Sequence, residues 1–292
     1  MHLKKYKSIL SSSNNLNIYR GFTHGCIYCD SRSKCYQFDH PFEDIEVKED
    51  LVEILRMELN RKRNPVMIGT GSMSDPYMNA EADLKITRSV LEMVYKTNHG
   101  ISILTKSDLI LRDLDIIDKI SKKTRFILQM TLTTFDEELA KKIEPNVAST
   151  KKRVDVLKQF AELGIDTIVW FCPILPFLND TILNIDKIID YCIEAKVKGI
   201  IFFGAGLTLR DGNREYFYEK LDELFPTLKN EYIKNYGLMY QCNSKNNKEL
   251  TAHFRKRCIE AGIMCDNQEI FNYLKKIDNK DSYKQLSIFD LL

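Results

Sequence analysis

The sequence predicts an α/β fold built on a parallel sheet. Between residues 16 and 203, short runs of mostly apolar residues alternate with longer segments whose apolar residues recur at helical spacing. The short runs are continuously apolar, which is typical of strands buried on both faces of a parallel sheet. We count six such strand–helix units, too few for a closed barrel of eight. The prediction is therefore an open or partial βα barrel.

The strands of these units are predicted to alternate with longer helices. The predicted strands lie at 16–19, 65–68, 101–104, 126–132, 167–171 and 199–203. The predicted helices lie at 48–63, 80–97, 111–121, 150–163 and 181–195, with a shorter segment at 135–142 before a break over 143–146. Gly164 follows the helix at 150–163, as a glycine commonly does at a helix C-terminus.

Beyond residue 211 the composition shifts towards Tyr, Phe, Lys and Asn, and we predict a mainly helical extension. The helix expected at 250–262 is basic, so it either presents a solvated face or contacts a nucleic-acid backbone. The predicted organisation is an N-terminal polar segment at 1–15, the barrel at 16–210, the helical extension at 211–275 and a flexible tail at 276–292.

Composition narrows the class of protein. A chain of 292 residues can bury a full core, and its 43 basic and 41 acidic residues leave a net charge of only +2. Any nucleic-acid surface would therefore have to be a local patch. The eight cysteines do not form the framework of a small disulfide-rich secreted domain. Neither an apolar leader segment nor an apolar run of membrane-spanning length is apparent, so we expect a cytoplasmic protein without membrane association.

The most informative stretch is the segment 18–30, IYRGFTHGCIYCD. It places Cys26 and Cys29 three positions apart in a glycine-containing loop, and Cys35 follows six residues later. Closely spaced thiolates on a tight loop suit a soft metal or an iron–sulfur cluster.

This segment resembles the cluster loop of radical S-adenosylmethionine (SAM) enzymes, above all the branch of spore photoproduct lyase and the "DNA repair photolyase" group. That branch has the pattern C-x3-C-x2-C, in which Cys26 and Cys29 match the last two cysteines and Tyr28 matches the aromatic between them. Phe22 stands where the first cysteine is expected. The resemblance implies a (βα)6 partial barrel, a [4Fe-4S] cluster, SAM, and reductive cleavage of SAM to a 5′-deoxyadenosyl radical. It also implies an external electron donor such as flavodoxin or ferredoxin.

Phe22 leaves the ligand set of the cluster open, because a phenyl ring has no atom that ligates iron. With Cys26 and Cys29 as ligands, the third would be Cys35, His24, Asp30 or a small molecule, and Cys35 is the most plausible chemically. The rival hypothesis is a non-catalytic relative that lacks the cluster and acts as a binding protein.

Polar residues follow the predicted strands, at the edge where parallel α/β folds bind ligands. The resemblance places Gly69, Thr70 and Gly71, after the second strand, against the amino group of SAM, and Tyr28 on the same cofactor. Ser107 and Thr131, at the ends of the third and fourth strands, are expected to reach the ribose or carboxylate of SAM, or a substrate phosphate.

Two positions bear on the substrate. Cys172, after the fifth strand, either donates a hydrogen atom to a substrate radical or simply packs. Ser72 stands where spore photoproduct lyase carries its hydrogen-donating cysteine, and an O–H is a far poorer hydrogen-atom donor than an S–H. We therefore expect a substrate other than that of spore photoproduct lyase.

The C-terminal segment QLSIF resembles the peptide by which bacterial replication and repair proteins bind the sliding clamp. Its anchors would be Gln285, Leu286 and Phe289, although the apolar residues among them could instead pack on the core. Together with the family resemblance, this segment makes DNA the favoured substrate class.

Overall fold

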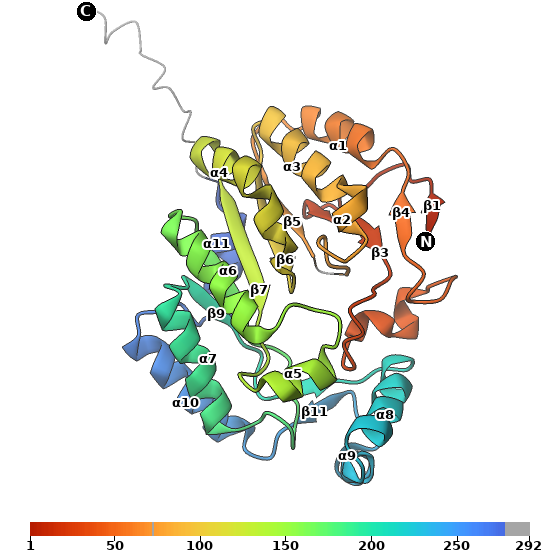
Figure 1. Cartoon of the computed structure of the whole chain (residues 1–292), viewed down its shortest axis with the longest axis vertical. Helices are drawn as coiled ribbons and strands as arrows, with labels where there is room; N and C mark the ends of the chain where they lie inside the picture. Colours follow the sequence, from red (N-terminus) through yellow and green to blue (C-terminus); the bar gives the residue numbers. More distant parts are fainter. Residues whose placement is uncertain (72, 278–292) are drawn as a thin grey trace, which may run out of the picture.

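The computed structural model describes residues 1–71 and 73–277 (Figure 1). Its main sheet has six parallel strands in the order β2-β5-β6-β7-β8-β9. The strands are β2 (Asn15–Leu16), β5 (Met67–Thr70), β6 (Gly100–Thr105), β7 (Phe126–Thr131), β8 (Thr167–Trp170) and β9 (Gly199–Ile201). The predicted α/β architecture of a six-stranded partial barrel is confirmed.

The helices that connect these strands cover one face of the sheet and follow one another around its outside in Figure 1. They are α1 (Leu51–Asn60), α3 (Ile86–Lys96), α4 (Leu114–Lys123), α6 (Thr150–Glu162) and α7 (Ile182–Glu194). Side chains alternate along the strands, so every second residue faces these helices. Ile68, Ile103, Leu128 and Val169 are fully buried in this core.

The opposite face of the sheet is covered by α11 (Asn267–Lys275), which follows α10 (Asn247–Glu260). Ile270 and Leu274 of α11 pack with Ile127, Ile168 and Ile201, the residues that alternate with those of the outer core. The last described helix therefore packs inside the curve of the sheet, and it leaves the carboxyl ends of the strands uncovered.

The rest of the C-terminal region forms a second cluster around aromatic side chains. It comprises α8 (Asn213–Leu224), α9 (Leu228–Tyr236) and the antiparallel pair β10 (Gly206–Thr208) and β11 (Gln241–Asn243). Phe217, Tyr232 and Tyr236 pack there with Cys26 and Ile27. These two residues belong to the loop over residues 21–30, which we call the cysteine loop. The C-terminal extension thus supports that loop directly.

Three predicted elements differ in detail. The strand expected at 16–19 is divided, because only Asn15–Leu16 pairs with β5, while β3 (Tyr19–Arg20) joins a second sheet with β1 (His2–Lys4) and β4 (Glu46–Lys48). The helix expected at 80–97 is interrupted at Lys85, whose positive φ of 53° separates α2 (Glu81–Leu84) from α3. The helix expected at 111–121 begins as a 3₁₀ helix over Asp108–Asp113.

The short helix α5 (Glu137–Ile143) includes the first residue of the break predicted at 143–146, and the loop begins at Glu144. No helix in the described ranges combines the length and apolar character that a bilayer crossing requires. The tail residues Gln285, Leu286 and Phe289 lie outside the described residues.

Candidate functional site

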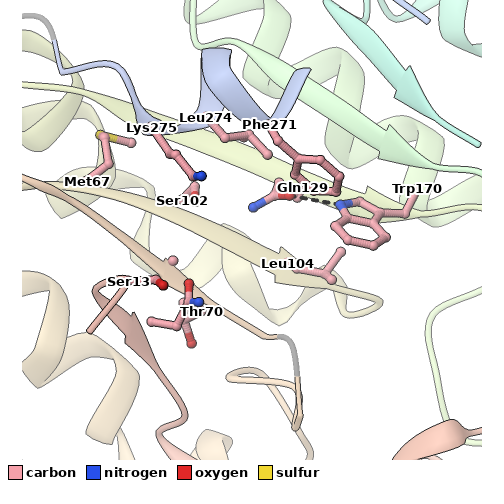
Figure 2. A pocket seen from close by; sticks show the side chains of 12 residues that line it. Ser13, Met67, Thr70, Ser102, Leu104, Gln129, Trp170, Phe271, Leu274 and Lys275 are labelled. Carbon is pink, nitrogen blue, oxygen red and sulfur yellow. Dashed lines mark hydrogen bonds between the residues drawn. The ribbon is translucent and has the colours of Figure 1, made fainter. Parts of the chain in front are cut away.

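Two adjoining cavities lie on the side of the sheet that α11 covers and at its strand ends. The first, which we call the barrel cavity, has a volume of about 250 Å³ and lies between the strands and α11 (Figure 2). Its lining includes Gly69, Ser102, Gln129 and Trp170 of the sheet and Phe271 of α11. Trp170 lines the cavity and donates from Nε1 to Gln129 Oε1 at 2.8 Å.

The second cavity, which we call the cysteine cavity, has a volume of about 160 Å³ and lies at the carboxyl ends of the strands. The loop that begins at Gly21 supplies one wall, and the ends of β5 to β8 supply the other. Leu104 and Trp170 line both cavities, so the two spaces meet at these side chains. The residues around the cysteine cavity are Phe22, Cys26, Tyr28, Cys29, Ser31, Gly71, Met73, Ser74, Leu104, Lys106, Thr131, Trp170 and Cys172.

Most of the predicted site residues lie around these two cavities. Cys26, Cys29, Tyr28, Gly71, Thr131 and Cys172 line the cysteine cavity, and Gly69 and Thr70 line the barrel cavity. Cys35 and Ser107 line neither. Cys35 is exposed and its Sγ accepts a hydrogen bond from Arg210 Nη1 at 3.4 Å, whereas the Ser107 hydroxyl accepts from the Leu109 amide and caps a 3₁₀ helix. Which of these residues bind a cofactor or metal stays a prediction.

The glycines at the end of β5 are required by close contacts. Gly71 has a φ of +95°, and a Cβ built on it would lie 2.2 Å from the carbonyl oxygen of Leu104. A Cβ on Gly69 would lie 2.5 Å from Asn15 Oδ1. Between them, Thr70 is buried and its Oγ1 has no hydrogen-bond partner. The turn therefore keeps its backbone close to the neighbouring strand and leaves one hydroxyl free to bind a ligand.

His24 and Asp75 fasten the cysteine loop to the strand ends. Asp75 Oδ2 lies 2.9 Å from His24 Nε2 and accepts from the Lys106 amide, and Asp75 Oδ1 accepts from Thr105 Oγ1 and the Tyr77 amide. Although burial raises the pKa of Asp75, the bonds from His24, Thr105 and Lys106 outweigh it and hold that pKa below its ordinary value. The sequence pattern gave no sign of this contact between Asp75 and the loop.

A buried ion pair fastens the same loop from the other side. Arg153 of α6 is fully buried, donates to Glu144 Oε2 at 2.6 Å and to the Thr131 carbonyl at 2.7 Å. Glu144 also accepts a hydrogen bond from the hydroxyl of Tyr28. Burial raises the pKa of Glu144, but Arg153 and Lys106 more than offset it, so the pKa is lowered. Arg153 was not anticipated, because a single arginine in a predicted amphipathic helix looks like a surface residue.

The loop itself runs along the segment that follows α5. The Ile27 amide donates to the Ile143 carbonyl at 3.0 Å, and the Asn146 amide donates to the His24 carbonyl at 3.1 Å. Asn146 Nδ2 also donates to the Thr23 carbonyl at 3.0 Å. The break over 143–146 is therefore a docking segment for the cysteine loop.

The thiols around the cavity are protonated in this environment. Burial raises the pKa of Cys26 to about 12 and that of Cys172 to about 12, and it also raises the pKa of Cys29, while the nearby Lys106 acts in the opposite direction on all three. A bound metal would reverse this, because coordination to a cation stabilises the thiolate.

Phe22 occupies the wall beside these thiols. Its ring packs edge-on against His24, with 4.8 Å between the ring centroids, and stacks on Phe42 at 6.4 Å. Its amide donates to the Phe42 carbonyl at 2.9 Å. A cluster held by three loop thiolates would need a cysteine at position 22. The cavity instead offers two loop thiols and a well-packed phenyl ring.

Comparisons with known proteins agree with this geometry. Residues 16–182 match the radical SAM superfamily. An uncharacterized protein of Mycobacterium tuberculosis is 29% identical over 229 residues, 76% of this chain and 66% of that protein. An uncharacterized protein of Methanocaldococcus jannaschii is 36% identical over 167 residues, 56% of this chain and 61% of that protein. The chain thus spans less than two thirds of the length of these relatives.

Solved structures share the fold at low identity. A cysteine-to-serine variant of spore photoproduct lyase has a TM-score of 0.66 at 12% identity, over 90% of this chain and 80% of that one. Another variant, with bound AdoMet and dinucleoside spore photoproduct, has a TM-score of 0.63 at 12% identity, over 85% and 74%. The radical SAM methyltransferase of Kitasatospora setae, with cobalamin and a [4Fe-4S] cluster bound, has a TM-score of 0.57 at 10% identity, over 83% and 52%.

Proposed function

Because this chain belongs to the radical SAM superfamily, we propose that it binds a [4Fe-4S] cluster in the cysteine cavity and SAM between that cavity and the barrel cavity. The observation that carries the proposal is that Cys26 and Cys29 line one cavity together with Gly71 and Thr131 at the strand ends. When bound, the cluster and SAM supply the one-electron reductive cleavage that yields a 5′-deoxyadenosyl radical.

The chain's own residues would position these groups and exclude water. Phe22, Met73, Leu104 and Trp170 give the cysteine cavity an apolar wall. Thr70 offers an unpartnered buried hydroxyl, and the Gly71 turn brings backbone close to the same space. Cys172 lies across the strand ends from the loop, and its raised pKa keeps it as a thiol, the form that donates a hydrogen atom.

Within this proposal, His24 is a better candidate for the third ligand than Cys35, although neither lines the cysteine cavity. His24 is 1% exposed, and its Nε2 lies 2.9 Å from Asp75 Oδ2, so in the neutral ring Nε2 carries the proton and Nδ1 carries a lone pair. That Nδ1 atom is buried without a hydrogen-bond partner and belongs to the residue two positions before Cys26. Imidazole nitrogen is an established ligand of iron–sulfur centres. Cys35, by contrast, is exposed and bonded to Arg210.

The test is anaerobic reconstitution with iron and sulfide, followed by metal counting and EPR of the reduced protein with and without SAM. We expect a four-iron cluster whose signal changes when SAM is added. The Cys26→Ala/Cys29→Ala double variant should hold no cluster. In the intact protein, pulsed EPR should show a coupled imidazole nitrogen that His24→Ala abolishes and Cys35→Ala retains. A cluster without a coupled imidazole nitrogen, formed by His24→Ala but not by Cys35→Ala, would instead assign the third ligand to Cys35.

Phe22 supports one alternative, a relative without a cluster that serves as a binding protein. That alternative predicts that the unmodified chain takes up no cluster, whereas Phe22→Cys does. Absence of a cluster in both proteins would reject the cluster proposal at this cavity altogether.

We propose DNA as the substrate class. An aromatic rim is formed by Trp170, Phe203 and Phe271, whose ring centroids lie 6.1 to 6.5 Å apart, and Phe203 is 61% exposed. A hollow of about 410 Å³ joins Phe203 to Arg255 of the basic helix α10. Exposed aromatics beside cationic side chains are what single-stranded nucleic acid requires. The clamp-binding segment at Gln285, Leu286 and Phe289 would bring the protein to its substrate.

Fluorescence anisotropy with a labelled single-stranded oligonucleotide tests this substrate class. Arg255→Ala should weaken binding and reduce its salt dependence, since a phosphate contact would be lost. Lys151→Ala, an exposed lysine on α6, is the matched control and should bind as the unmodified chain does. Equal binding by the two variants would contradict the assignment of α10 to DNA.

A further inference from the structure

A second group of metal-ligating side chains lies in the small sheet β1-β4-β3, apart from both cavities. Strand β1 pairs in parallel with β4, and the register sets His2 opposite Glu46. The segment between the cysteine loop and β4 adds Asp39 and His40 to this point. We call Asp39, His40 and Glu46, with His2, the histidine–carboxylate cluster.

Glu46 is fully buried, an unusual place for a carboxylate in a three-residue strand. Its Oε1 accepts a hydrogen bond from the Tyr6 hydroxyl, but its Oε2 has no hydrogen-bond partner. Burying a carboxylate oxygen without a hydrogen bond is costly unless a cation lies beside it, and in the ion-free chain Lys4 Nζ lies 3.2 Å from this oxygen.

His40 faces that oxygen with the atom that binds metals. Its side chain is only 9% exposed, and its Nδ1 lies 2.9 Å from the Pro41 carbonyl, which can only accept. In the neutral ring Nε2 is therefore the nitrogen with the lone pair, and it is buried without a hydrogen-bond partner. It lies 3.7 Å from Glu46 Oε2 and 3.9 Å from Asp39 Oδ1.

These separations are too long for hydrogen bonds but suit ligands on either side of one ion. Zinc binds histidine nitrogen and carboxylate oxygen at about 2.0–2.2 Å, so two ligands of one ion lie on the order of 3.5 Å apart. The three ligand atoms of Asp39, His40 and Glu46 all lie within 4.8 Å of one another.

His2 repeats the arrangement of His40. Its Nδ1 lies 2.8 Å from Asp44 Oδ2, so in the neutral ring Nε2 has the lone pair, and this nitrogen lies 4.0 Å from Glu46 Oε2. A histidine whose second nitrogen is held by a carboxylate or a carbonyl is the usual arrangement of a metal ligand. Both histidines thus direct their free nitrogen to the same buried oxygen.

We propose that Asp39, His40 and Glu46 bind a divalent transition-metal ion of the zinc class, with His2 as a further ligand. In the ion-free chain Lys4 supplies the positive charge, because its Nζ lies 3.0 Å from Asp39 Oδ2 and 3.2 Å from Glu46 Oε2. The Lys4 side chain is 36% exposed, so it can turn into solvent when the ion binds. Arg20, whose charge also acts on Glu46, is held elsewhere by the Tyr36 and Gln37 carbonyls.

The ion would stabilise the packing around Phe22, in the cavity wall beside the cysteine pair. The segment from Phe38 to Glu46 carries Phe42, which stacks on Phe22 and accepts its amide hydrogen. The ring of Phe38 packs edge-on against His40 at 5.3 Å. Fixing His40 and Glu46 to one ion therefore fixes the packing around Phe22.

The test measures zinc bound per chain after equilibrium dialysis, on full-length protein without an affinity tag. All variants are made in the Cys26→Ala/Cys29→Ala protein, because these two thiols would otherwise bind zinc themselves. We expect one zinc per chain, and a cobalt-substituted sample without the absorption of cobalt–thiolate bonds. Adding His40→Ala should weaken binding at least about 100-fold. Adding Lys4→Met should tighten it, because the competing cation is removed.

The matched control is His253→Ala, on α10, where His253 Nε2 lies 2.7 Å from Asp186 Oδ1 and Arg257 donates to the same oxygen. This histidine–carboxylate pair is already neutralised, so its loss should leave zinc binding unchanged. Absence of stoichiometric zinc in the background protein would overturn the proposal. So would equal binding by the His40→Ala protein, or binding that Lys4→Met leaves unchanged or weakens.

Discussion

The cysteine loop is held from two sides, and the two sides differ in chemistry. Residues 24–29 are fixed by polar contacts, through His24 to Asp75 and through Tyr28 to Glu144 and Arg153. Residues 21–22 are fixed by packing, with Gly21 and Phe22 set against Phe42. The side that carries the two thiols is complete in its supports, and the side that lacks a thiol is well packed as an apolar wall.

This difference indicates that a phenylalanine at position 22, where the family pattern has its first cysteine, changes only its immediate surroundings. The supports of Cys26 and Cys29 do not pass through Phe22, because Asp75, Glu144 and Arg153 come from other elements. The supports of the two thiols are therefore complete although residue 22 is not a cysteine. The following predictions test whether the two sides are independent, beginning with the largest expected effect.

Arg153→Met should have the largest effect, because it leaves Glu144 charged and unpaired among buried groups. Breaking a buried ion pair in this way costs about 3–5 kcal/mol in the free energy of unfolding. Chemical denaturation measures it. Lys158→Met, which breaks the exposed pair of Lys158 with Glu194 on the outer helices, is the control and should change stability little. A similarly small loss of stability in the two variants would show that Arg153 is not needed to neutralise the buried Glu144.

Gly21→Ala should damage the packed side. Gly21 has a φ of +95°, and an added Cβ would lie 2.8 Å from the Phe42 carbonyl oxygen that accepts the Phe22 amide. Backbone strain of about 1–2 kcal/mol and a weakened hydrogen bond of about 1 kcal/mol give a loss of about 2–3 kcal/mol. Gly164→Ala is the matched control, since Gly164 also has a positive φ but nothing lies within 4 Å of its Cβ position. Equal losses would mean that strain alone, and not the contact with Phe42, sets the cost.

Asp75→Asn should weaken the polar side by about 2 kcal/mol, because charge-assisted hydrogen bonds are lost. Its pH dependence is diagnostic. The folded pKa of Asp75 lies below its ordinary value, so its contribution is present above pH ~4 and is lost as the pH falls through the folded pKa. The unmodified chain should therefore lose more stability than Asp75→Asn between about pH 5 and pH 2. Parallel stability curves for the two proteins would exclude an ionised Asp75 as the anchor of His24.

The sequence predicted the parts of this molecule that follow from local pattern. The six strands, their helices and the thiol pair are visible in periodicity and spacing, because each depends on residues close together in the chain. The family resemblance added the turn at Gly69 and Gly71. Arg153, Asp75 and the division of the first strand between two sheets were not predictable in this way, since each depends on partners distant in the sequence. Cys35 shows the converse, because proximity in sequence did not bring it to the cavity.

Phe22→Ala and Phe22→Cys should have the smallest effect on stability and separate packing from ligation. Both variants remove a half-buried ring from His24 and Phe42, so both should lose a similar amount, about 1–2 kcal/mol, before any iron is added. Only the cysteine adds a ligand, so only Phe22→Cys should be stabilised on reconstitution beyond the unmodified chain. The measurement is thermal unfolding of each protein before and after anaerobic loading. A larger loss in Phe22→Ala, with Asp75→Asn adding nothing further, would show that the packed side also holds the polar side in place, and the independence of the two sides would then be wrong.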